Sequence, residues 1–133
     1  MKRKIIVSAT AILFSVIGYS QTNCAKFRNG TFKLTDPKSK EVCIITRDGN
    51  KQTERMEQSD NTYDFEINWT DDCTYTVTPT PSTAQRNPDV LKSGVMTVKI
   101  IKANKDSYTQ KVTIATDPKF SRVDEVFVAE DKK

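Results

Sequence analysis

The sequence predicts an all-β domain, an antiparallel up-and-down meander of about eight strands that closes, or nearly closes, into a barrel. Apolar and polar residues alternate over short segments, most regularly over 63–69, which is the pattern of a half-buried strand and not of a helix. Turn residues separate these segments, and strands do not alternate with helices, as expected for consecutive hairpins. Because a flat meander would expose two edges, closure is favoured; a half-barrel or a two-sheet sandwich is the alternative.

The first three expected strands are 30–35, 41–47 and 51–58. Turn residues at 36–39 separate the first two, and Asp48-Gly49-Asn50 predicts a tight reversal before the third, because Gly and Asn tolerate positive φ. Both faces of the third strand are polar. We therefore favour a place at a sheet edge or on the surface for this strand, over an arrangement that turns polar groups to the interior.

Within this third strand, Glu54 and Arg55 have opposite parity, so their side chains point to opposite faces and cannot contact each other. At most one of them faces the interior. An edge or surface role is favoured for both, in line with the polarity of the strand.

The next hairpin is expected to join strands 63–69 and 73–78. Asp71 and Asp72 lie at its turn. Adjacent carboxylates in a turn point apart and stay hydrated, and Asp is a preferred turn residue, so we interpret this pair as a turn and not as a metal or acid–base site.

A long connection with several prolines, 78–94, follows, with at most one helical turn at 89–93. A connection of this length in a compact domain is often functional or mobile. The last expected strands are 96–100, 108–114 and 123–128.

The amino terminus predicts export. Residues 1–20 contain three basic residues, then an apolar run over 5–17 and small residues at 18–20, which is typical of a cleaved secretory signal peptide and too short for a membrane anchor. Because the residues before Cys24 lack a lipobox, we expect a periplasmic or secreted protein without a lipid anchor. The mature domain would be 21–133.

Composition excludes several classes of function. The signal peptide removes three of the 21 basic residues and none of the 17 acidic ones, which leaves a net charge of +1 and gives no support for nucleic-acid binding. The chain has no His and only four Gly, so imidazole zinc sites, Ser-His-Asp and Cys-His catalysis and phosphate-binding loops are not expected. We predict no enzymatic activity, no metal, no cofactor and no membrane span.

Three cysteines in an oxidising compartment predict one disulfide and one spare thiol. Because strands in a meander alternate in direction, Cys24, before the first strand, and Cys73, at the turn between the fourth and fifth strands, lie at the same end of the barrel. Cys43 opens the second strand at the opposite end. Topology therefore predicts a Cys24–Cys73 disulfide, with Cys43 a buried free thiol that serves packing.

Two patterns, C-x-x-F-x-x-G-x-F from Cys24 and W-x-x-x-C-x-Y from Trp69, resemble a family of small exported proteins typical of the Bacteroidota, whose members often carry the label "DNA topoisomerase IV". The resemblance covers about 24–113 and implies no established activity. The label itself does not fit this chain, which lacks the Gly-rich nucleotide lid and the size of a type II topoisomerase. Gly30-Thr31-Phe32 also resembles the G-x-W opening of lipocalins, with Phe in place of Trp, so the expected barrel is lipocalin-like.

The candidate site is a set of large inward-facing residues that either line a ligand cavity or fill the barrel: Tyr63, Phe65, Ile67, Trp69, Tyr75 and Tyr108. The short strands favour a filled core for these residues. Our leading hypothesis is an exported, non-enzymatic barrel that binds a small apolar or amphipathic molecule. The alternative is a structural or protein-interaction domain with a filled core and no ligand.

Overall fold

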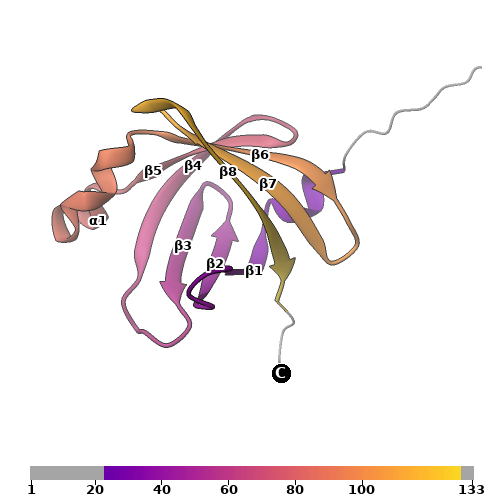
Figure 1. The fold of residues 1–133 in the computed structure, drawn as a ribbon, viewed down its shortest axis with the longest axis horizontal. Helices are drawn as coiled ribbons and strands as arrows, with labels where there is room; N and C mark the ends of the chain where they lie inside the picture. Colours follow the sequence, from indigo (N-terminus) through magenta and orange to yellow (C-terminus); the bar gives the residue numbers. More distant parts are fainter. Residues whose placement is uncertain (1–22, 130–133) are drawn as a thin grey trace, which may run out of the picture.

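A computed structural model describes residues 23–129 and confirms the predicted fold, a closed eight-stranded antiparallel barrel within that range (Figure 1). Each strand pairs with the next in the sequence, and β8 returns to β1. The predicted signal peptide, 1–20, lies outside the described residues, as does the end of the predicted domain, 130–133.

The strands of the barrel, in chain order, are β1 (Gly30–Thr35), β2 (Val42–Asp48), β3 (Lys51–Met56), β4 (Tyr63–Asp71), β5 (Thr74–Pro79), β6 (Met96–Ala103), β7 (Ser107–Ile114) and β8 (Asp117–Val128). Three short helices accompany them in the described part of the chain: η1 (Ala25–Phe27), α1 (Pro81–Arg86) and η2 (Pro88–Ser93). Helix η1 precedes β1, whereas α1 and η2 lie in the connection between β5 and β6.

The two ends of the barrel carry different connections, because consecutive strands run in opposite directions. The base holds the start of β1 and the turn between β4 and β5, and η1 covers it; the mouth holds the end of β5, the start of β6 and helix α1. Figure 1 shows α1 at the left and the violet η1, where the described chain begins, at the right, on opposite sides of the barrel. The barrel closes through a short seam, in which Phe32 pairs with Val128 and Lys33 with Phe127.

The structure corrects the expected edge position of β3. This strand pairs with β2 on one side and with β4 on the other. Gln52 is buried and lines the interior together with Glu54, so the strand turns its polar groups inward. The edge prediction is wrong because the closed barrel has no free edge at β3 and because the interior contains buried polar partners for this strand.

Two further elements differ from expectation. The structure contains helix α1, which the sequence prediction did not include. The start of this helix has the usual signals, because the Thr80 side chain accepts a hydrogen bond from the Thr83 amide and Pro81 occupies the first turn. Strand β8 begins at Asp117 and not at Val123. Its first half pairs with β7 across a register shift between Val112 and Ile114, where the alternation of polarity is lost.

The predicted disulfide is confirmed. Cys24 and Cys73 are bonded across the base, with their Cα atoms 5.3 Å apart. The bond fixes η1 beneath the barrel, where Phe27 packs with Phe32 and Tyr108 in one buried cluster. Cys43 is a free thiol, as predicted, but it is only partly buried.

We predict that removing the disulfide is costly and that removing the free thiol is not. The bond closes a loop of 49 residues, so the double substitution Cys24→Ala/Cys73→Ala should lower the free energy of unfolding by about 4 kcal/mol in the chain-entropy description. Urea unfolding under non-reducing conditions measures this difference. Cys43→Ala is the matched control and should lower the free energy by less than half as much; equal losses would contradict the prediction.

Candidate functional site

The interior of the barrel has a filled base and a hollow upper half. Large side chains pack without exposure at the base, among them Phe27, Phe32 and Tyr108. Above them lies a cavity of about 370 Å³ that opens at the mouth. This volume falls at the lower end of the range of small-molecule sites, roughly 300–1,000 Å³.

A buried arginine, Arg47, forms the boundary between the two halves. It is 2% exposed and lies near the base end of β2. Its guanidinium Nε donates to Gln52 Oε1 at 2.8 Å, Nη1 donates to the Phe27 carbonyl at 2.7 Å, and Nη2 donates to the hydroxyls of Tyr75 and Tyr108. These bonds join η1, β2, β3, β5 and β7.

Aromatic rings complete the surroundings of this cation. The Arg47 guanidinium carbon lies 4.6 Å from the centre of the Phe32 ring and 5.0 Å from that of Tyr75. A cation over an aromatic face is attracted by the ring quadrupole, and a desolvated pair contributes on the order of 2 kcal/mol. The buried charge is therefore compensated by hydrogen bonds and rings, with no ion pair to Arg47 among the described residues.

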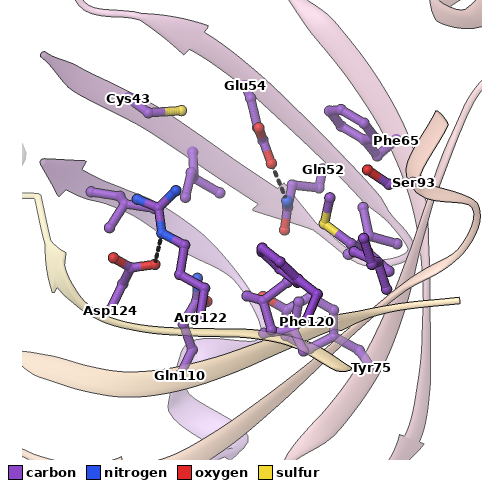
Figure 2. A pocket seen from close by; sticks show the side chains of 17 residues that line it. Cys43, Gln52, Glu54, Phe65, Tyr75, Ser93, Gln110, Phe120, Arg122 and Asp124 are labelled. Carbon is purple, nitrogen blue, oxygen red and sulfur yellow. Dashed lines mark hydrogen bonds and ion pairs between the residues drawn. The ribbon is translucent and has the colours of Figure 1, made fainter. Parts of the chain in front are cut away.

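A short polar relay leads from Arg47 into the cavity. Gln52 accepts from the guanidinium and donates through Nε2 to Glu54 Oε2 at 2.7 Å, a bond drawn in Figure 2. Burial raises the pKa of the Glu54 carboxyl, while the Gln52 hydrogen bond and the Arg47 charge oppose the shift. The relay therefore places a carboxyl with weakened acidity on the cavity wall.

The remaining wall is mainly apolar. Every strand except β3 contributes apolar side chains to it: Leu34, Ile45, Phe65, Val77, Met96, Val98, Val112, Ile114 and Phe120. Cys43 also lines the cavity, and burial, with a further contribution from the Glu54 charge, raises the pKa of its thiol to about 12. This thiol is neutral and of low nucleophilicity at neutral pH.

A second polar group lies on the wall formed by β7 and β8. Arg122 Nε and Asp124 Oδ2 are 2.8 Å apart; the Arg122 side chain is 47% exposed and that of Asp124 only 8%. Gln110, the register partner of Asp124, is buried beside the pair and lines the cavity (Figure 2). Ser93, at the end of η2, also lines the cavity, so the long connection reaches it.

The six residues proposed from sequence separate into three groups. Phe65 and Tyr75 line the cavity, and Tyr75 at the same time bounds the base. Ile67 and Tyr108 are buried in the core. Tyr63 and Trp69 are partly buried and do not line the cavity.

Trp69 packs at the base and does not reach the cavity. Its ring centre lies 4.5 Å from that of Tyr75, and Arg28 covers it with the guanidinium carbon 4.5 Å from the ring centre. The indole Nε1 is buried and has no hydrogen-bond partner in the described part of the chain.

Apart from Glu54, which was weighed as an interior residue of the third strand, the charged residues of the site and Gln110 were not singled out from the sequence. Arg47, Gln110 and Asp124 carry a signal that could have identified them, because each has the parity of apolar residues that face the interior: Arg47 that of Ile45, Gln110 that of Tyr108. Asp71, by contrast, accepts a bond from the Cys73 amide at 2.9 Å, as expected for a turn residue, and Asp72 is exposed.

Replacing Arg47 should destabilise the barrel strongly. Arg47→Met leaves the Phe27 carbonyl and the hydroxyls of Tyr75 and Tyr108 buried without their donor, at about 1–3 kcal/mol for each group, so a loss of at least ~3 kcal/mol is expected. Denaturant unfolding measures it. Lys111→Met, at an exposed position of β7, should change stability by less than about 0.5 kcal/mol.

The same cluster allows a test of coupling. In the Arg47→Met background, Tyr75→Phe should cost less than in the wild type, because it removes a hydroxyl that no longer accepts from the guanidinium. Additive costs would show that the Arg47–Tyr75 bond does not contribute to stability.

Glu54→Gln should stabilise the protein in a pH-dependent way. Since burial raises the pKa of Glu54 above its ordinary value of 4.5, the folded state holds the proton over a pH range in which the unfolded state has lost it, and stability falls as pH rises through that range. Gln does not titrate, so the advantage of Glu54→Gln should grow above pH 4.5 and level off above the folded-state pKa, by about 1.4 kcal/mol for each pKa unit.

Chemical denaturation of both proteins over a pH series measures this advantage. Glu66→Gln, at an exposed position of β4, is the control and should show no such growth. A difference between Glu54→Gln and the wild type that is constant over pH would contradict the prediction.

Comparisons with known proteins do not add a family or an activity. No family model matches the chain, and neither a curated protein nor a solved structure matches it. Among residues 23–129, no helix has the length and apolar character needed to cross a membrane, and no group of three His, Cys, Asp or Glu side chains could hold a metal ion.

Proposed function

We propose that the protein is an exported, non-enzymatic binding protein that holds one small amphipathic molecule in the upper half of its barrel. The observation that carries this proposal is the 370 Å³ cavity, with mainly apolar walls and a few polar side chains. Sites for small molecules combine these two features, because apolar area supplies affinity and the polar groups orient the ligand.

The division of the interior supports the binding role over a purely structural one. A structural barrel of this size can fill its interior completely with side chains. Here Arg47 and its aromatic neighbours fill the base, and the side chains above them leave space open to the mouth. The stable base would hold the walls of the cavity in place.

The alternative role in protein interaction is favoured by a different observation. The outer face of the barrel exposes large apolar side chains on β8, Val123 and Phe127, and Leu91 is exposed on η2. Large apolar side chains exposed on the outer face are candidates for an interaction surface. Under this alternative the cavity would have no specific ligand.

Export and the absence of catalysis rest mainly on the sequence. The 1–20 segment has the pattern of a signal peptide, and the Cys24–Cys73 disulfide fits an oxidising compartment. The chain has no His, and the nearest thiol to the cavity carboxyl, Cys43, has a raised pKa, so it is a poor nucleophile. The resemblance to small exported Bacteroidota proteins is consistent with export and implies no activity.

The proposal is tested by binding of N-phenyl-1-naphthylamine, a neutral apolar dye whose fluorescence rises in apolar surroundings. The wild type should bind it, and Val112→Phe, which places a ring in the cavity, should weaken binding about tenfold or more. Val123→Phe makes the same substitution on the exposed outer face of β8 and should leave binding unchanged.

Binding that is equal in Val112→Phe and in the wild type would place the dye outside the cavity and refute the proposal. Native mass spectrometry of the protein from its own cells gives a second readout: a co-purified small molecule, absent from Val112→Phe, supports the binding role. Amino-terminal sequencing of the same sample should begin at Gln21 if the signal peptide is cleaved.

A further inference from the structure

The ionisable groups on the cavity wall are not balanced. Glu54 and Asp124 are the carboxyls of the wall, and Arg122 is its only lining cation in the described part of the chain. Arg122 is already paired with Asp124 at 2.8 Å and is half exposed at the mouth. Arg47 does not line the cavity, because Gln52 and Tyr75 lie between its guanidinium and the open space.

Glu54 is therefore the wall carboxyl that makes no ion pair, because the charge of Arg47 acts on it only from behind Gln52. Its Oε2 accepts one hydrogen bond, from Gln52, and no basic side chain of residues 23–129 lies within 4.0 Å of it. A carboxylate accepts up to about four hydrogen bonds, so most of its capacity is free. Figure 2 shows its carboxyl on the cavity side of β3, above the Gln52 amide.

A second polar group on the wall also has unused capacity. Gln110 is 7% exposed and lines the cavity, and its side-chain amide makes no hydrogen bond within the described residues. Trp69 Nε1 is the only fully buried side-chain polar atom without a partner among the described residues, so the Gln110 amide faces the open space of the cavity, where a ligand can bond to it. Gln110 lies on β7, and Glu54 on β3, so the two groups come from different walls of the same apolar space.

We propose that the cavity selects a cationic amphiphile, a molecule with an apolar body and one protonated amine, whose ammonium group pairs with the Glu54 carboxylate. This inference rests on the proposed function and adds the chemical class of the ligand. The Gln110 amide oxygen serves as a neutral acceptor for a polar hydrogen of the same molecule.

Charge distinguishes this class from the alternatives. An ammonium gains a charge-assisted hydrogen bond with Glu54 in surroundings of low dielectric, where such a bond is about twice as strong as a neutral one. A neutral alcohol gains only an ordinary hydrogen bond. A carboxylate head group would bring a second negative charge beside Glu54, and the nearest lining cation, Arg122, is already paired with Asp124.

Binding of the cation should also depend on pH. Burial raises the pKa of Glu54, and an ammonium group pairs with the ionised form and not with the protonated one. The other ionisable groups near Glu54 are Arg47 and Cys43 on β2, Tyr63 and Tyr75 on β4 and β5, and Arg122 and Asp124 on β8. Amine affinity should therefore rise with pH through the Glu54 pKa and then level off.

The test compares three ligands with the same tail, dodecylamine, dodecanol and dodecanoate, by isothermal titration calorimetry below their aggregation concentrations. For the wild type near neutral pH we expect dodecylamine to bind about tenfold or more tightly than dodecanol, and dodecanoate to bind most weakly. Glu54→Gln should remove the preference for the amine and leave dodecanol binding within about twofold. Glu66→Gln is the matched control and should keep the preference.

The outcomes separate the two proposals. If none of the three ligands binds the folded wild type, the binding function is refuted together with this inference. If dodecanol or dodecanoate binds as tightly as dodecylamine, or if folded Glu54→Gln keeps the preference, the cationic class is overturned while the binding function stands. The wild-type comparison of head groups needs no variant, so a Glu54→Gln protein that failed to fold would not remove the test.

Discussion

The structure depends on one buried cation. The Arg47 guanidinium bonds to η1, β3, β5 and β7 at once, through a carbonyl, an amide and two phenols. The strands it joins lie on different sides of the barrel, whereas the seam between β1 and β8 consists of two register pairs. A planar guanidinium with five donors in a fixed geometry suits this position, because each hydrogen bond fixes where the element that carries its acceptor lies.

This cation also explains the polarity of β3. A strand with polar residues on both faces is unfavourable in an apolar barrel, yet Gln52 is buried because it accepts from Arg47 and donates to Glu54. Gln52 thus connects the buried Arg47 guanidinium to the Glu54 carboxyl on the cavity wall, and the Arg47 charge acts on that carboxyl. Removing any member would leave a buried polar group unpaired, so the three residues form one unit.

Much of the fold follows from local information in the sequence. Alternation and turn residues predict the strands and hairpins, and the alternating direction of a meander predicts the Cys24–Cys73 disulfide, which the structure confirms. The edge position of β3 could not be excluded in this way, because whether a polar strand is buried depends on partners elsewhere in the barrel. Helix α1 is too short for a periodic pattern, and only its capping residues indicate it.

The candidate site was harder to predict from the sequence than the fold, because its open space depends on the sizes of side chains at equivalent positions of several strands. An eight-stranded barrel is just wide enough either to be filled or to hold one small ligand. At the base the inward residues are Phe32, Arg47 and Tyr108, which fill the interior; toward the mouth the same strands present Leu34, Cys43 and Val112, which do not. Parity along one strand predicts which residues face inward, but the open space is a property of all the strands together. The sequence therefore predicted a barrel with inward aromatics and left open whether they fill it. The structure shows that Tyr75 and Tyr108 fill the base, whereas Phe65 and mainly smaller side chains bound the space above.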